Sequence, residues 1–192
     1  MILALAILGA LVAGFIYASM FEWTLHKYVM HHPFFGLRYA FKAHALTHHR
    51  VFSWDETYVI ARKEDEPLVT FAWWNMPVLM ALNAPVFIGG GWLAAGFAVT
   101  PVFWGAAAGA AGAMLVYYFL YEYLHWCMHV PTGRWFERSR WFRFIDDHHR
   151  MHHRRPTKNL NVVMPLADWI LRTKAPGLAP VSRIAAEALE AR

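Results

Sequence analysis

Positive charge is missing from two long stretches of this 192-residue chain. No lysine or arginine precedes Lys27, and none occurs between residues 64 and 133. Residues 1–21 carry no charged side chain at all, and about 20 apolar residues are enough to cross the hydrocarbon core of a bilayer. A cleavable signal peptide would begin with a basic region and end at small residues, and neither feature is clear here. We therefore predict that residues 1–21 form a membrane-spanning helix that is retained.

Further apolar stretches predict additional spans. Residues 67–88 open with a proline, a favourable first residue of a helix, and the glycines at 89–91 indicate a turn. A third span is expected at 102–124, where the run GAAAGAAGA suits close packing against another helix in lipid. Residues 86–100 are expected to form a turn, a re-entrant half-helix or the kinked start of the last span. Residues 181–192 are expected to form a short exposed helix.

The distribution of the basic residues predicts how the chain lies in the membrane. All 18 lysines and arginines fall in two blocks, Lys27–Lys63 and Arg134–Arg192, which flank the apolar stretches. This is the positive-inside pattern, and it places residues 22–66 and 125–175 in the cytoplasm, with a bacterial inner membrane as the expected location. No recognition motif accompanies the charge, so we expect no binding to nucleic acid. The predicted fold is an all-α integral membrane domain over residues 1–192, with three to four transmembrane helices under a cytosolic histidine-rich cap.

Histidine is the metal-binding residue type that this sequence supplies in quantity. The single cysteine, Cys127, cannot form an internal disulfide. No C-x-x-C pair occurs, which excludes thiolate zinc ribbons and iron–sulfur clusters held by cysteines. The chain has 12 histidines. Ten of them fall into four spaced sets, which are His26 and His31; His44, His48 and His49; His125 and His129; and His149, His152 and His153.

The spacing within these sets suggests shared metal ions. Residues four apart lie on one face of an α-helix, as in the pairs 44/48, 125/129 and 149/153, and 149/152 is an i,i+3 pair. His26 and His31 are five apart, so they need a π-bulge, a helix end or separate metals. The neighbours His48 and His49 point in different directions, which suits bridging two metals. Because one ion takes roughly four to six ligands, ten nitrogens divide naturally over two ions.

The remaining histidines and the nearby acids have different expected roles. His32 and His148 each duplicate a neighbour outside the spacing, so we expect them not to be ligands. Carboxylates close to metal-bound histidines often orient the imidazole rings from behind. The acids placed to do this are Glu22, Glu122, Asp146 and Asp147.

In these motifs the chain resembles the fatty acid hydroxylase superfamily, the integral-membrane diiron oxygenases that include sterol desaturases and C-4 methyl oxidases. The shared pattern is H-x4-H at 26–31, H-x3-H-H at 44–49, H-x3-H at 125–129 and H-x2-H-H at 149–153. The stretch NLNVVMPLADWILRT at 159–173 is similar to the closing segment of that family. The resemblance covers roughly residues 15 to 175, and the set of motifs in this order is highly specific.

The resemblance implies a function, two iron ions and an external electron donor. The ten spaced histidines would be the ligands, and the reaction would be O2-dependent hydroxylation or desaturation of a membrane lipid such as a fatty acyl chain or a sterol-like molecule. The sequence has no nucleotide, flavin, haem or ferredoxin motif, so a separate donor of the ferredoxin or cytochrome type, with its reductase, is expected. Its docking surface would be basic and include Arg134, Arg138, Arg140, Arg154 and Arg155. The alternatives are a carotenoid β-ring hydroxylase and, in another class, a non-redox membrane protein that binds zinc.

Overall fold

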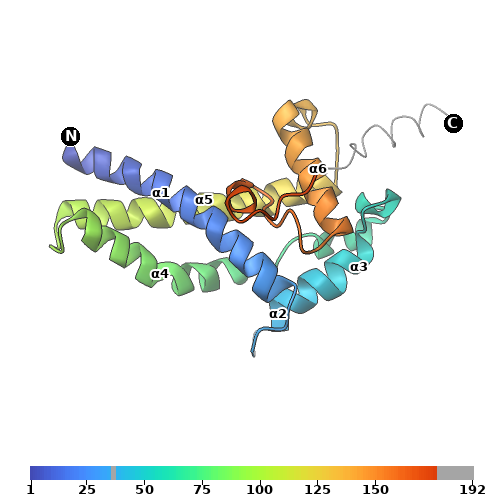
Figure 1. Cartoon of the computed structure of the whole chain (residues 1–192), viewed down its shortest axis with the longest axis horizontal. Coiled ribbons are helices and arrows are strands. Elements are labelled where there is room, and N and C mark those ends of the chain that lie inside the picture. The colour runs from blue at the N-terminus through green and yellow to red at the C-terminus, as the bar shows by residue number, and fades with distance from the viewer. Residues whose placement is uncertain (36–37, 177–192) are drawn as a thin grey trace. The chain divides into compact units, whose positions relative to one another are not determined.

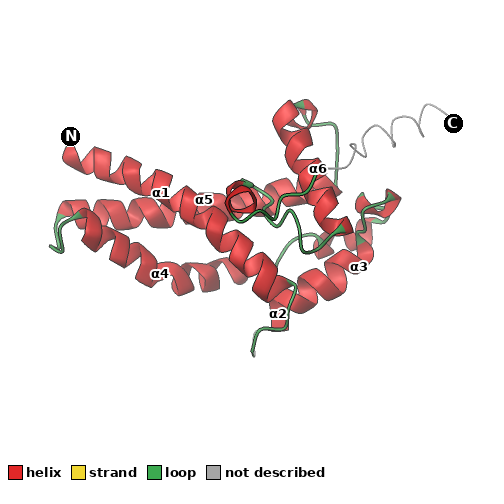
Figure 2. Cartoon of the chain, in the orientation of Figure 1, coloured by secondary structure: helices red, strands yellow, loops and turns green. Residues whose placement is uncertain are grey.

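The regular secondary structure in the described part of the chain is helical. This computed structural model describes residues 1–35 and 38–176 (Figure 1), and no β-strand occurs among them (Figure 2). The helix expected at 181–192 lies outside the described residues. Two compact units are present. The apolar unit comprises residues 1–21 and 72–121, and the histidine unit comprises residues 22–71 with the described part of 122–192.

Among the described residues, three helices are long and apolar enough to cross a membrane. The first is α1 (Ile2–Leu25), which continues as the π-helix η1 (His26–Met30). The others are α4 (Asn75–Ala94) and α5 (Pro101–His129). Their mean hydropathy is 2.3, 1.4 and 1.4. The sequence prediction of an all-α chain with at least three membrane-capable helices is therefore confirmed.

The predicted boundaries of the second span are wrong at both ends. Pro67 lies in a 3-10 helix, η4 (Lys63–Leu68), and α4 begins only at Asn75. Residues 69–71 belong to the histidine unit, where Val69 is buried and the Phe71 N–H donates to the Glu122 carboxylate (3.2 Å). These tertiary contacts compete with helix formation at residues 69–71, although the apolar composition there favours a helix.

The glycines at 89–91 are also not a turn, because all three lie inside α4. A Cβ atom on Gly91 would lie 2.7 Å from the Phe103 carbonyl oxygen, so glycine here allows α4 to pack closely on α5. The chain turns later, at Gly96 and Phe97, which both have positive φ angles. Helix α5 then starts at Pro101, and residues 86–94, predicted to be part of the connection, complete α4.

The small-residue run of α5 packs as expected against α1. A Cβ atom on Gly14 would lie 2.6 Å from Ala113 Cβ, and one on Gly109 would lie 3.0 Å from the Ile7 carbonyl oxygen. These positions leave room for no larger residue. Such contacts between small residues are the usual way in which helices approach each other in lipid, where apolar side chains gain nothing by leaving their surroundings.

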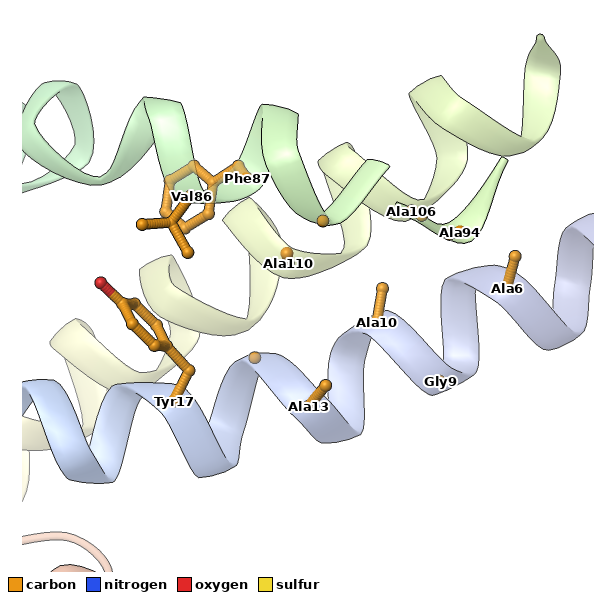
Figure 3. Close-up of a pocket in the computed structure, with 12 residues that line it drawn as sticks. Ala6, Gly9, Ala10, Ala13, Tyr17, Val86, Phe87, Ala94, Ala106 and Ala110 are labelled. Atoms are coloured by element: carbon orange, nitrogen blue, oxygen red, sulfur yellow. The ribbon is translucent and has the colours of Figure 1, made fainter. Parts of the chain in front are cut away.

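The apolar unit also contains a cavity between α1, α4 and α5. It has a volume of about 410 Å³ and is lined mainly by alanine and glycine. Figure 3 shows Ala10 and Ala13 of α1 facing this space and Tyr17 reaching toward α4. The Tyr17 hydroxyl donates to Asn83 Oδ1 (2.6 Å), and Asn83 Nδ2 donates to the Leu79 carbonyl (2.8 Å). The buried amide is therefore satisfied within this unit.

The histidine unit is built from short helices and the ends of two long ones. The π-helices are η1 and η2 (Lys42–His48), and the 3-10 helices are η3 (Glu56–Tyr58), η4 and η5 (Trp135–Arg138). The α-helices are α2 (Arg38–Phe41), α3 (His49–Val51), α6 (Arg140–Arg154) and α7 (Leu166–Ile170). Ser139 caps α6, because its Oγ accepts from the Phe142 N–H (3.1 Å).

A buried carboxylate organises the last described segment of this unit. Asp168 is fully buried and accepts hydrogen bonds from the backbone N–H groups of Leu160 (3.0 Å) and Asn161 (2.8 Å). It also accepts from the Thr173 hydroxyl (2.5 Å) and from His148 Nε2 (3.0 Å). Because these four donors bind one side chain, Asp168 connects the loop after α6, at Leu160 and Asn161, with the turn after α7, at Thr173.

Candidate metal centre

All ten spaced histidines meet in the histidine unit as two groups of five. Within each group the ligand nitrogens all lie within 4.8 Å of one another. Both groups consist of histidines alone. We call them the His26 group, which is His26, His31, His44, His49 and His152, and the His48 group, which is His48, His125, His129, His149 and His153.

Two π-helical turns explain how residues five apart share a group. The His31 N–H donates to the His26 carbonyl (3.2 Å), and the His49 N–H likewise donates to the His44 carbonyl. In an α-helix each N–H donates to the carbonyl four residues earlier, whereas here it donates to the carbonyl five residues earlier. The wider turn brings each H-x4-H pair onto one face. Of the three arrangements expected at 26–31, the π-bulge is the one present, and it is repeated at 44–49.

The i,i+4 pairs behave in two different ways. His125 and His129 share one group, and His149 and His153 share the same one. His44 and His48 are divided between the two groups, although their rings stack with centroids 5.3 Å apart. The neighbours His48 and His49 also point into different groups, with their rings at 87° to each other. The expectation that this adjacent pair connects two sites agrees with the geometry.

The spacing of the ring nitrogens fits metal coordination. In the His26 group, Nε2–Nε2 distances are 2.8 Å for His26–His44 and 3.0 Å for His31–His152. In the His48 group they are 3.2 Å for His129–His149 and 3.0 Å for His149–His153. Two nitrogens bound to one ion at about 2.1 Å lie roughly 3.0 to 3.4 Å apart. Each group therefore has the dimensions of one coordination sphere.

Backbone carbonyls determine which ring nitrogen faces the centre. A carbonyl oxygen only accepts, so each Nδ1 that contacts one must carry the proton and leave its Nε2 with a lone pair. Five rings are oriented in this way. The pairs are His26 with Leu160, His48 with Leu68 (3.2 Å), His129 with Tyr58 (2.7 Å), His152 with Lys158 (2.9 Å) and His153 with Phe52 (2.7 Å). Unprotonated nitrogens at 3 Å repel one another unless a cation lies between them, so this donor set fits metal ions.

The sequence suggested that Glu22 and Asp146 orient imidazole rings, and in the structure they bind the segments whose carbonyls contact two of those rings. Glu22 accepts from the Val162 N–H (2.6 Å) and from Asn161 Nδ2 (2.9 Å), and so anchors the segment whose Leu160 carbonyl orients His26. Asp146 accepts from the Tyr58 hydroxyl (2.9 Å), and the Tyr58 carbonyl orients His129. These carboxylates position the carbonyls behind the rings.

The other two acids have different surroundings. Glu122 accepts a hydrogen bond from the Phe71 N–H, which lies near the start of the apolar stretch 67–88. Asp147 lies beside His148 and Lys174 at a small cavity of about 180 Å³. Burial raises the pKa of Asp146 to about 7 and that of Asp147 to about 6, against the charge of Arg150, which lowers both.

Burial keeps the imidazoles in the form that binds metal. Removal from water lowers the pKa of His31 to about 4 and that of His152 to about 3. The pKa values of His44, His48, His49, His149 and His153 are also well below the usual range, first because of burial and then because neighbouring imidazoles repel a second charge. At neutral pH these rings are therefore neutral, each with a lone pair available.

The two histidines expected not to be ligands lie outside both groups. His32 is exposed. His148 is buried, and its Nε2 donates to Asp168 rather than facing the nitrogens of either group. His148 is therefore a structural residue of the Asp168 network, which its position beside the ligand motif did not reveal.

Other contributors to the site carried little signal in the sequence. Tyr58 is fully buried and packs its ring 4.6 Å from His129 and 5.4 Å from His153. Nothing in the sequence around it distinguishes it from a surface tyrosine. Asp168 was visible only as part of the PLAD stretch, and the orienting carbonyls have no sequence signature at all. Comparisons of the chain with protein-family models, with curated proteins and with solved structures gave no match.

Proposed function

We propose that this chain is a membrane diiron oxygenase of the fatty acid hydroxylase superfamily, and that it oxidises C–H bonds of a membrane lipid. The observation that supports this most is the division of ten buried imidazoles into two groups of five. The three membrane-capable helices of the same chain favour a lipid over a water-soluble substrate.

The donor set fits iron better than structural zinc. Structural zinc sites are closed by four ligands, commonly with cysteine among them. Each group here offers five nitrogens, which suits a metal with a higher coordination number. Two iron ions bound here would supply the activation of O2 needed to oxidise an unactivated C–H bond.

The chain's own residues would hold and shield these ions. Backbone carbonyls fix the ring orientation of at least five ligands, so little rearrangement is needed on binding. Phe52 and Tyr58 are both buried and pack on His129, with ring centroids 4.8 Å and 4.6 Å away. Their rings exclude water from the His48 group, which favours oxidation of the lipid over side reactions with solvent.

Electrons would come from a separate protein that docks on basic residues of the histidine unit. Arg138, Arg140 and Arg155 are exposed and fit this role. Arg154 is exposed as well and lies over the Trp54 ring (4.7 Å). Arg134 fits less well, because it pairs with Glu137 and lies over the Trp126 ring (4.5 Å).

Metal analysis combined with O2 consumption tests the proposal. Protein from iron-replete cells is expected to contain two irons per chain, and to consume O2 when given a reduced donor and a lipid extract. Isotope-labelled O2 should place its label in a lipid if the reaction is hydroxylation. Comparison of lipids from cells with and without the gene distinguishes a fatty acyl or sterol-like substrate from a carotenoid.

The matched variants are His129→Ala, which removes a nitrogen from the His48 group, and His32→Ala, which changes an exposed histidine outside both groups. The first should abolish O2 consumption and the second should retain it. Zinc as the only bound metal, with no O2 consumption after reconstitution with iron, would reject the oxygenase and support the zinc-binding alternative.

A further inference from the structure

Three consecutive apolar side chains lie on the surface of the histidine unit where α7 ends. Trp169, Ile170 and Leu171 are 51, 58 and 40% exposed. We call residues 169–174 the apolar turn. Exposed apolar residues are common singly, but a contiguous set marks a contact with another apolar medium or molecule.

The apolar turn has a defined backbone conformation that is fixed by hydrogen bonds. The Leu171 N–H donates to the Ala167 carbonyl (2.8 Å), and the Thr173 N–H donates to the Asp168 carbonyl (2.9 Å). Arg172 has a φ of 56°, a conformation that residues other than glycine rarely adopt. Since buried Asp168 also accepts from the Thr173 hydroxyl, the surrounding contacts hold this strained turn in place.

The apolar turn is bonded to the end of a membrane-capable helix. Trp23 Nε1 donates to Thr173 Oγ1 at 2.8 Å, and both residues belong to the histidine unit. Trp23 lies within Ile2–Met30, the most apolar of the three candidate spans. The turn therefore contacts the end of this candidate span that belongs to the histidine unit.

Cations and aromatic rings surround the apolar turn in the manner of a membrane interface. The Lys27 ammonium lies 4.5 Å from the Trp23 ring centroid and 5.1 Å from that of Tyr28. The Lys174 ammonium lies 5.4 Å from the Trp169 centroid. Tryptophan and tyrosine collect at the headgroup level of bilayers, and lysine reaches past them to anionic lipid.

We propose that the apolar turn inserts into the headgroup region of the same membrane that α1 crosses. Trp169, Ile170 and Leu171 enter the boundary with the acyl chains, and Arg172 and Lys174 contact anionic headgroups. A second copy of the chain fits this surface poorly, because a two-fold contact centred on the turn would bring Arg172 and Lys174 close to the same two cations of the partner, and like charges repel. The inserted turn would fix the histidine unit to the lipid surface at a second point besides its helices.

Collision measurements on a spin label test this in the full chain. A nitroxide is attached at Ile170→Cys and, as the matched control, at Arg140→Cys, an exposed residue at the start of α6. The parent protein gives the background, because its only cysteine, Cys127, is buried. The protein is placed in nanodiscs of phosphatidylcholine, with or without phosphatidylglycerol, and collisions with O2 and with a water-soluble nickel chelate are compared. Unchanged circular dichroism and metal content establish that each labelled protein is folded.

The label at 170 is expected to collide several-fold more with O2 than with nickel, and the label at 140 is expected to show the reverse. Adding phosphatidylglycerol should increase the preference for O2 at 170, and Lys174→Gln should remove this dependence on lipid charge. Preferential collision with nickel at 170 would show a water-exposed turn, and exclusion of both reagents would show a protein contact. Either result overturns the proposal. A preference for O2 that does not depend on lipid charge would reject the role of the cations.

Discussion

At the scale of single residues, the role of each histidine depends on what its second ring nitrogen contacts. His152 and His153 donate from Nδ1 to backbone carbonyls and present Nε2 to a group of nitrogens. His148 lies on the same helix but points Nε2 at Asp168. Spacing in the sequence separated His148 from the ten histidines that form the two groups. It did not show that His148 is buried and bonded to a carboxylate.

His148 and His32 should therefore respond differently to substitution, although neither belongs to a metal group. His148→Ala removes one of the four donors to buried Asp168 and is expected to lower the free energy of unfolding by about 1–3 kcal/mol. His32→Ala changes an exposed side chain and should leave stability nearly unchanged. Thermal unfolding of both variants in detergent measures the difference. Equal stability of the two would contradict the structural role of the His148–Asp168 bond.

At the scale of secondary structure, the π-helices η1 and η2 decide which histidines share a group. Each closes an H-x4-H pair with a backbone hydrogen bond between the two histidines themselves. An extra residue in a helical turn is costly and is usually found at functional sites. Both π-helices are thus explained by the nitrogens that they bring together.

Deleting Val29 from η1 tests this at the same scale. The deletion converts H-x4-H to H-x3-H and should turn His31 away from the His26 group, while every member of the His48 group lies elsewhere in the sequence. Bound metal is expected to fall by about half, because one site loses a ligand and the other is kept. Val29→Ala keeps the spacing and should retain both ions. Elemental analysis of the two proteins decides, and full metal content in the deletion variant would argue against the role of the π-helix.

At the scale of the whole molecule, the sequence predicted the helical class, the membrane-capable helices and the identity of the ten converging histidines. The length of the uncharged stretches predicts the helices, and the spacing of the histidines predicts the convergence, and both can be read from short pieces of the sequence. The sequence could not predict which histidines belong to which group of five, because the pairing of His26 with His152 depends on the tertiary fold. The start of α4 was missed for a similar reason, since contacts of Val69 and Phe71 compete with local helix preference.

Burying so many imidazoles makes the stability of the metal-free protein depend on pH. His31 and His152 have pKa values of about 4 and about 3 in the fold, against an ordinary value near 6.5. The unfolded chain therefore binds more protons between these values, and the folded state is favoured less as pH falls. Stability should be greatest above pH ~6.5 and should decline as pH drops from there toward 3. Thermal unfolding of chelator-treated protein across this range measures the effect, and a melting temperature independent of pH would contradict it.

Each group of histidines also joins an early motif to the last one, since His26 meets His152 and His48 meets His153. This has a consequence for how the protein is made. If the two groups bind ions as proposed, a nascent chain on the ribosome must expose residue 153 before the His48 group can offer its full set of nitrogens, and residue 152 before the His26 group can. By then the three apolar helices, which all end before residue 130, have already been synthesised. The ions would then be added to a chain whose membrane-capable helices are complete, rather than to its early segments.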